Sequence, residues 1–181
     1  MKKVFLTMIC ALGLVGCGAH TPDFYAENTP KMEMTEFFNG KVDGWGVIYD
    51  WKGRVVKRFH ILMDGKWQTR DGGQKVFRLD ELFTFADGST MERGWDIEKT
   101  GEDTFVGYAE ESPEPAKGVQ KGNAAKWNYH FDMPYNGKTI RLKMDDWMWL
   151  VDENTLVNRN KFYKFGLNVG EINIFFRKTP A

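Results

Sequence analysis

The sequence predicts an all-β protein, folded as an antiparallel up-and-down β-barrel of about nine or ten strands. Three observations favour this fold. Turn signals such as Asp71-Gly72 and Asn136-Gly137 recur at short intervals from residue 37 onward. The segments between them are about ten residues long and rich in Phe, Trp, Tyr, Val and Ile, as strands are. Apolar and polar residues alternate within these segments, and no long amphipathic helix is evident.

The chain begins with a pattern typical of a secretory signal peptide. Lysines follow Met1, and residues 4–16 form an apolar run that is short for a bilayer span, which takes about 20 residues. Leu14-Val15-Gly16-Cys17 resembles a bacterial lipobox, which implies a diacylglyceryl thioether on Cys17 and cleavage before it. We expect a lipoprotein signal peptide over 1–16. The alternative is an ordinary signal peptide with an incidental cysteine.

The cysteine count agrees with lipidation. The other cysteine, Cys10, lies within the predicted signal peptide, so Cys17 would stand alone and no disulfide is expected. Stable anchoring needs more than one acyl chain, and a triacylated cysteine meets this need. By resemblance to enterobacterial sorting signals, Gly18 favours the periplasmic face of the outer membrane. We expect a lipidated cysteine with a polar tether over 17–35 and one barrel domain over 36–181.

The charge composition argues against nucleic acid as a partner. The chain holds 25 basic and 25 acidic side chains, and loss of Lys2 and Lys3 leaves a slight acidic excess. Nucleic-acid binding needs a concentrated positive surface. No second apolar run approaches spanning length, so the acyl chains are the expected membrane contact. The sequence leaves open whether the protein has a periplasmic protein partner.

Strand boundaries follow from the alternation. In 125–133, Ala125, Trp127 and Tyr129 share one face while Lys126 and Asn128 share the other. In the first strand, the aromatic-rich face carries Trp45, Val47, Tyr49 and Trp51. The predicted strands are 42–51, 54–63, 66–70, 75–86, 90–99, 103–110, 125–133, 138–150, 155–165 and 169–178.

Tight hairpins suit most of the connections, and barrel closure removes exposed strand edges. A barrel therefore ranks ahead of a two-sheet sandwich. Segment 110–123 carries two prolines and three acidic residues and is predicted to be a mobile surface loop. A filled and a hollow barrel share the same alternation, so the sequence does not determine the cavity volume.

Two charged residues fall on faces that should be apolar. Glu81 shares a face with Phe83, and Arg93 shares a face with Trp95. With a hairpin loop at 87–89, Glu81 would lie opposite Trp95 and diagonal to Arg93, within reach of an ion pair. The pair either fixes the hairpin register as a buried structural pair or binds the head group of a ligand.

Asp146 is a third inward-facing polar residue. It falls between Met144 and Met148 on the apolar face of 138–150, although a bulge at 145–146 would turn it outward and put Trp147 inside. A calcium site would need more oxygen ligands than these adjacent acids supply. The residues predicted to line a ligand cavity are Glu81, Phe83, Arg93, Trp95, Trp127, Tyr129 and Asp146.

The catalytic inventory is thin. His20 lies in the predicted tether, and His60 and His130 fall on polar faces, so neither a zinc site nor another metal site is expected. Ser89 and Ser112 lie outside any G-x-S-x-G motif. We expect no cofactor and no enzymatic activity.

Several short motifs together resemble one family of small proteobacterial lipoproteins, domain of unknown function 3833. They are FFNG (37–40), GWG (44–46), DELF (80–83), RGW (93–95), KGNAAKWNY (121–129), DDWMWL (145–150), NRN (158–160), KFG (164–166) and INIFF (172–176). The resemblance covers nearly all of the chain after the signal peptide and implies a lipocalin-like, calycin-like barrel, with no established activity. It departs at EESPEPAKG (110–118), where a more apolar segment is expected.

Three functions follow from these expectations. The first is a carrier of an amphipathic small molecule, such as a fatty acid or a phospholipid-like molecule. The second is an assembly lipoprotein with a packed barrel that acts through protein partners. The third is an enzyme that uses Glu81 or Asp146 as an acid or base, which the thin inventory disfavours.

Overall fold

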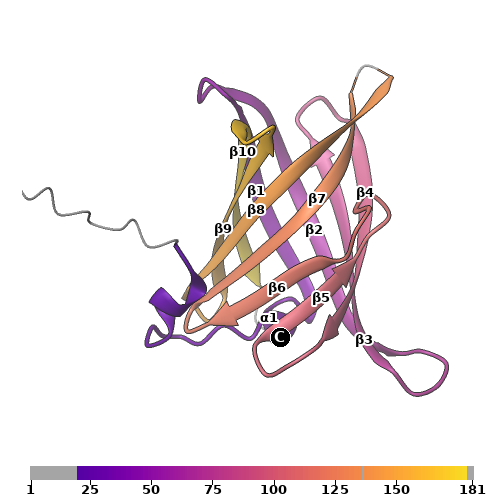
Figure 1. Ribbon diagram of the computed structural model, residues 1–181, viewed down its shortest axis with the longest axis vertical. Helices are drawn as coiled ribbons and strands as arrows, with labels where there is room; N and C mark the ends of the chain where they lie inside the picture. The colour runs from indigo at the N-terminus through magenta and orange to yellow at the C-terminus, as the bar shows by residue number, and fades with distance from the viewer. Residues whose placement is uncertain (1–19, 136, 179–181) are drawn as a thin grey trace, which may run out of the picture.

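The computed structural model describes residues 20–135 and 137–178, and these form a closed antiparallel barrel (Figure 1). The predicted signal peptide and Cys17 lie outside the described residues. The strands are β1 (Gly40–Asp50), β2 (Val55–Thr69), β3 (Lys75–Phe85), β4 (Thr90–Lys99), β5 (Thr104–Tyr108), β6 (Ala116–Lys121), β7 (Ala124–Tyr135), β8 (Lys138–Asp152), β9 (Thr155–Lys164) and β10 (Leu167–Lys178). Each strand pairs with the next along the chain, and β10 pairs with β1 to close the barrel. The predicted up-and-down fold is confirmed.

The predicted break between strands 54–63 and 66–70 is wrong. Residues 54–63 and 66–70 belong to the single strand β2, and Asp64-Gly65 makes no turn because both residues stay paired with β3. Gly65 serves a different purpose. A Cβ there would lie 2.0 Å from the carbonyl oxygen of Phe38, so glycine allows the N-terminal segment to approach β2.

Segment 110–123 is not simply a mobile loop, because it contains strand β6. The inward positions of β6 are Ala116, Gly118 and Gln120, none of them large and apolar. A strand with such inward residues lacks the apolar alternation on which the prediction depended.

The aromatic-rich face of β1 points outward, a direction that its alternation alone does not decide. Val42, Gly44 and Gly46 are the buried residues of this strand, while Trp45 is exposed. A Cβ on Gly46 would lie 2.3 Å from the Phe59 ring. Inward glycines on β1 therefore make room for aromatic rings from neighbouring strands.

The N-terminal segment covers one end of the barrel. It contains the 3-10 helix η1 (Pro22–Tyr25) and the short helix α1 (Met34–Phe37). Met32, Met34, Phe37 and Phe38 are buried in the same core as the inward strand residues. Within the described part of the predicted tether, Pro22, Met32, Met34 and Thr35 are buried, so part of this segment packs against the barrel.

The barrel wall is weakly paired in one place. Within the described residues, β4 pairs with β5 only over 96–99, and β6 pairs with β7 only up to residue 128. Segment 109–115 lies here, and the Asp132 N–H donates to the Glu111 carbonyl (2.8 Å). We call the region formed by 90–95, 109–115 and 129–135 the wall gap.

Among the residues that the structure describes, no helix has the length and apolar character needed to span a bilayer.

Candidate functional site

Glu81 on β3 and Arg93 on β4 form an ion pair on the inner side of the barrel, with Glu81 buried and Arg93 half-buried. Arg93 Nε donates to Glu81 Oε2 at 2.6 Å, and the Glu81 side chain is 6% exposed. The prediction of an inward-facing pair is confirmed. The predicted diagonal geometry is wrong, because Glu81 lies directly opposite Arg93 and Leu79 lies opposite Trp95.

The hairpin turn explains this difference in register. The Phe85 N–H donates to the Ser89 carbonyl (2.9 Å), so the loop is residues 86–88 instead of 87–89. Gly88 takes the left-handed conformation in this loop (φ 85°). The one-residue difference in the loop moves each cross-strand partner by two positions.

Aromatic rings surround the Arg93 guanidinium. Its Cζ lies 5.4 Å from the Phe83 ring centroid, 5.7 Å from Trp95 and 5.5 Å from Phe131. Among the described residues, Arg93 donates a hydrogen bond only to Glu81, and it does so through Nε. Its two Nη groups therefore keep their donors for another acceptor, while the aromatic faces stabilise the cation.

Burial and charge oppose each other in this pair. Burial raises the pKa of Glu81, and the Arg93 cation partly offsets that rise. Burial is the largest single influence and lowers the pKa of Arg93, but Glu81, Tyr129 and Glu111 together outweigh it and leave the pKa above its ordinary value. Arg93 is therefore a permanent cation in a largely apolar interior.

A second polar group stands on β7, β8 and β9. Tyr129 Oη donates to Asp146 Oδ2 (3.3 Å), and Asn158 Nδ2 donates to Asp146 Oδ1 (2.5 Å). Asn160 Nδ2 donates to Tyr129 Oη (2.9 Å). All four residues are buried, and burial raises the pKa of Asp146 to about 7. This carboxyl can therefore gain or lose a proton near neutral pH.

Asp146 faces inward, and no bulge interrupts the strand at 145–146. The alternative that placed Trp147 inside is wrong. Trp147 points outward and is buried because His20 stacks on it (ring centroids 4.2 Å apart) and Tyr25 lies edge-on beside it (6.0 Å). The outward tryptophan is covered by the N-terminal segment, which no local alternation reveals.

Sequence reasoning missed Asn158 and Asn160. They alternate with Leu156 and Phe162 on the inward face of β9. The signal was available in the sequence, since a period of two through 155–164 places both amides on the apolar face. Asn160 Oδ1 has no hydrogen-bond partner among the described residues, so one acceptor in this interior is unsatisfied.

Both polar groups border one small internal cavity of about 60 Å³. Six of the predicted ligand-lining residues border it: Glu81, Arg93, Trp95, Trp127, Tyr129 and Asp146. Phe83 is outside that lining, beside Arg93. The cavity has room for about two water molecules, at about 30 Å³ each. It has no room for a long acyl chain in this conformation.

Three methionines complete the cavity lining: Met34, Met63 and Met148. The Trp127 indole N–H donates to Met34 Sδ (3.2 Å). Methionine side chains are unbranched and repack easily, so this lining can change shape more readily than a lining of branched side chains.

A groove on the outer side of the wall meets the same ion pair. It has a volume of about 650 Å³ and extends over β2, β3, β4 and segment 108–111. Glu81 and Arg93 line both this groove and the internal cavity. Asp64, Asp80 and Glu111 add negative charge on the outer side. The ion pair therefore separates the interior from the surface.

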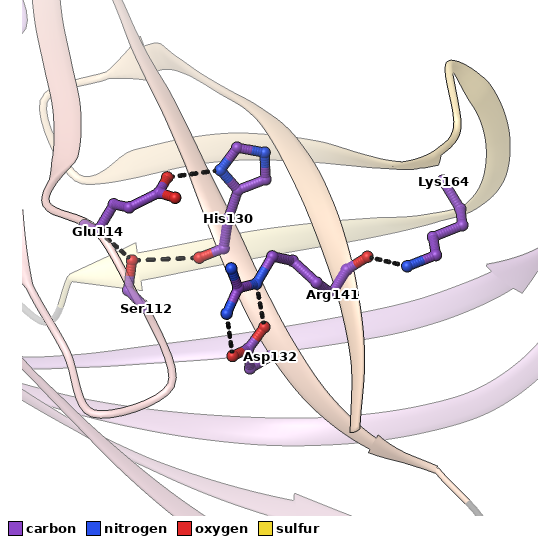
Figure 2. A network of polar contacts seen from close by, with 6 residues as sticks. All are labelled: Ser112, Glu114, His130, Asp132, Arg141 and Lys164. Carbon is purple, nitrogen blue, oxygen red and sulfur yellow. Dashed lines mark hydrogen bonds and ion pairs between the residues drawn. The ribbon is translucent and has the colours of Figure 1, made fainter. Parts of the chain in front are cut away.

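Segment 109–115 is held by the contacts in Figure 2. Ser112 Oγ hydrogen-bonds with the Glu114 carbonyl (2.7 Å) and the His130 carbonyl (3.1 Å). His130 Nδ1 donates to a Glu114 carboxylate oxygen (2.8 Å). His130, on the polar face of its strand, ties this segment to β7. His60 likewise pairs with Asp43 on the outer wall (2.8 Å).

The described part of the chain contains no group of three His, Cys, Asp or Glu residues that could hold a metal ion.

The family model described as "Protein of unknown function (DUF3833)" matches residues 11–178. The chain belongs to the DUF3833 family. No curated protein matches this sequence. The DUF3833 barrel is similar to the S-type phycobiliprotein lyase from Guillardia theta, with a TM-score of 0.57 and 9% identity over 90% of this chain and 99% of that one.

The DUF3833 barrel is also similar to a DUF3598 protein of unknown function from Nostoc punctiforme. Here the TM-score is 0.54 and the identity 13% over 83% of this chain. This chain spans about half of the Nostoc protein, 51% of its length. At these identities the similarity establishes the shared barrel architecture alone.

Proposed function

We propose that this protein binds an amphipathic small molecule with an acidic head group, such as a fatty acid or a phospholipid-like molecule. The observation that carries the proposal is Arg93. It is a half-buried cation whose Nη donors have no partner among the described residues, ringed by aromatic side chains, between a surface groove and an internal cavity. Ligand sites combine apolar walls with a few placed polar groups in this way.

The head group would hydrogen-bond to the Arg93 Nη donors at the wall gap. The apolar part would enter among Trp95, Trp127 and the methionines, which must repack because the cavity measures only about 60 Å³. The barrel shared with a phycobiliprotein lyase is compatible with small-molecule binding. A binder without catalysis needs no group beyond those already described.

The test uses the chain from Gly18 onward, which retains every described element. Cis-parinaric acid is titrated against tryptophan emission. Saturable energy transfer is expected, and Arg93→Gln should weaken binding about tenfold by removing charge-assisted hydrogen bonds. Trp127→Phe should reduce the transfer efficiency, whereas the outward Trp45→Phe should leave the affinity unchanged.

Failure of a well-folded chain to bind the probe would contradict the proposal. That result would favour the second candidate function, an assembly protein with a packed barrel. The small volume of the internal cavity is the specific observation on its side. Its partner contacts would then lie on surface segments such as 109–115.

We further propose that Cys17 carries the acyl chains of a lipoprotein and that the barrel lies at the periplasmic face of the outer membrane. Support comes from the residue pattern at 14–17. Mass spectrometry of the N-terminal peptide should find a triacylated Cys17. Cys17→Ser should abolish that modification and release the protein from the membrane fraction. An unmodified cysteine would contradict lipidation.

A further inference from the structure

Two neighbouring hairpin tips lie at the barrel end opposite α1 (Figure 1), and each carries an exposed aromatic side chain. Trp51 on the β1–β2 tip is 69% exposed, and Phe165 on the β9–β10 tip is 92% exposed. The tips are adjacent because β1 pairs with β10, with Asp50 opposite Gly170. We call these two tips, residues 50–55 and 164–169, the aromatic rim.

Phe165 occupies a costly backbone position. Its φ is 51°, and Gly166 follows with φ 80°. Turn positions of this kind favour Asn, Asp or Gly, and a bulky residue there is unfavourable. Because the ring is almost fully exposed, packing within the described fold does not offset the cost. Such local strain is typical of functional positions.

A lysine ammonium group lies over each of the two exposed rings. Lys52 Nζ lies 4.8 Å from the Trp51 ring centroid, and Lys164 Nζ lies 4.9 Å from the Phe165 centroid. Neither lysine makes an ion pair with a described carboxylate, so both charges are available to an external partner. Aliphatic side chains extend the exposed apolar surface: Val55, Val56, Leu167 and Val169.

A basic hollow continues from the rim down the outer face of β7, β8 and β9. It measures about 670 Å³ and ends at Phe165 and Gly166. Its charged lining consists of Lys126, Arg141, Lys143, Lys164 and Asp145, together with His130. Figure 2 shows Lys164 reaching the Arg141 carbonyl (2.9 Å).

The ion pairs leave this hollow positive. Lys126 pairs with Asp145 (3.0 Å), and Arg141 pairs with Asp132 (2.8 Å). Lys143 has no ion-pair partner in the described part of the chain, and Lys164 has none either. The hollow therefore offers two unneutralised ammonium groups beside an exposed aromatic ring.

We propose that the aromatic rim and the basic hollow dock on an anionic phospholipid surface. Trp51 and Phe165 enter the head-group region, and Lys143 and Lys164 hold lipid phosphates. Aromatic rings flanked by lysines suit this interface, since the rings prefer the boundary layer and the ammonium groups stay with the phosphates. The charge complementarity commits the surface to anionic lipid.

This contact goes beyond the proposed ligand site and does not depend on acyl chains at Cys17. It also brings the uncovered barrel end to the bilayer, where Ile48, Phe85, Met133 and Ile172 are only partly buried. A ligand drawn from the membrane would meet these residues first.

The test is sedimentation of the unlipidated chain from Gly18 with vesicles of phosphatidylglycerol and phosphatidylethanolamine. Salt-sensitive binding is expected, with little binding to phosphatidylcholine vesicles. Trp51→Ser with Phe165→Asn should weaken it about tenfold or more. Lys143→Gln with Lys164→Gln should weaken it about tenfold and flatten its salt dependence.

Phe165→Asn guards against a folding artefact, because Asn tolerates positive φ and this variant should melt at the same or a higher temperature. Phe24→Ser is the matched control, since Phe24 is 78% exposed in the N-terminal segment.

Three results would each overturn the proposal: no binding by the wild type, rim variants that bind as well as the wild type, or an equal loss of binding in Phe24→Ser. Equal binding to phosphatidylcholine would do so too. Probe binding in vesicle-free solution tests the ligand site separately and should be unchanged in the rim variants.

Discussion

Arg93 and Asp146 show how a few buried polar residues set the chemistry of an otherwise apolar interior. Arg93 stays charged because Glu81 lies 2.6 Å away, and Asp146 sits among neutral donors. One group is thus a fixed cation and the other a carboxyl that titrates near neutral pH. Their different surroundings allow different behaviour within one cavity.

Removal of Arg93 alone should destabilise the fold. Arg93→Met leaves the Glu81 carboxylate buried without its partner, at a cost of about 3–5 kcal/mol in the free energy of unfolding. The double variant Glu81→Leu with Arg93→Met should recover most of that loss. Urea unfolding measures both. Arg54→Met, which removes an exposed ion pair with Asp50, should cost under about 1 kcal/mol. A double variant no more stable than Arg93→Met would contradict this account.

Asp146 should make stability depend on pH. Its pKa rises from an ordinary 3.8 to about 7 in the folded barrel, so the folded chain binds the proton more tightly than the unfolded one. The free energy of unfolding should therefore be greatest below about pH 4 for this group and fall as pH rises to about 7, by on the order of 4 kcal/mol. Glu81 contributes in the same direction. Urea melts across this range should give a shallower slope for Asp146→Asn, and an unchanged slope would contradict the assignment.

The same residue should couple ligand binding to pH. An anionic head group near Asp146 is disfavoured once this carboxyl ionises, so affinity for an acidic ligand should rise as pH falls through about 7. Titration of cis-parinaric acid at several pH values measures this. Asp146→Asn should bind with a weaker pH dependence. An identical dependence in both proteins would assign it to another group.

At the scale of elements, β6 and the N-terminal segment support each other. The Met34 N–H donates to Gln120 Oε1 (3.2 Å), and Gln120 Nε2 donates to Glu33 (3.3 Å). The β6 strand is short and has small inward residues, so its contacts with α1 replace packing that its own side chains do not provide.

Gln120→Ala should loosen this connection. It leaves a buried backbone N–H without its acceptor, which costs about 1–3 kcal/mol. Hydrogen exchange should increase in residues 32–38 more than in β8. Gln68→Ala, at an exposed position of β2, is the matched control and should leave exchange unchanged. Equal exchange in both variants would show that α1 is held by its apolar contacts alone.

The whole molecule is a barrel with two unlike ends. One end is covered by α1 and a core that includes Phe38, and the other carries the aromatic rim (Figure 1). Gly65 is the position where the cover meets the wall, since its missing side chain admits the Phe38 carbonyl. We therefore expect the proposed membrane contact at the rim end, whereas the proposed ligand site lies in the wall beside Glu81 and Arg93.

Gly65→Ala should disturb the covered end of the barrel. The new methyl group would lie 2.0 Å from the Phe38 carbonyl oxygen, which forces the N-terminal segment away from β2. We expect a loss of about 1–3 kcal/mol in unfolding free energy, as in other overpacked cores. Calorimetry measures it, and Gly53→Ala, in an exposed turn, tests the separate cost of positive φ. An unchanged melting temperature for Gly65→Ala would contradict the close contact.

The sequence by itself determined the class of the fold and the inward direction of its key charges. Alternation with a period of two is a local property of a strand, so Glu81, Arg93 and Asp146 could be placed inside from neighbouring residues alone. Where the inward residues were glycines or lacked large apolar side chains, as in β1 and β6, the same rule left the inward face of β1 undecided and missed strand β6.

Only the tertiary structure decided how these residues meet. Loop 86–88 set Glu81 directly opposite Arg93, and closure of β10 on β1 brought Trp51 near Phe165. The covering of Trp147 by the N-terminal segment and the cavity volume of about 60 Å³ also arise from contacts between distant segments. Side-chain direction follows from the local backbone, whereas register, closure and packed volume depend on how the whole chain fills space.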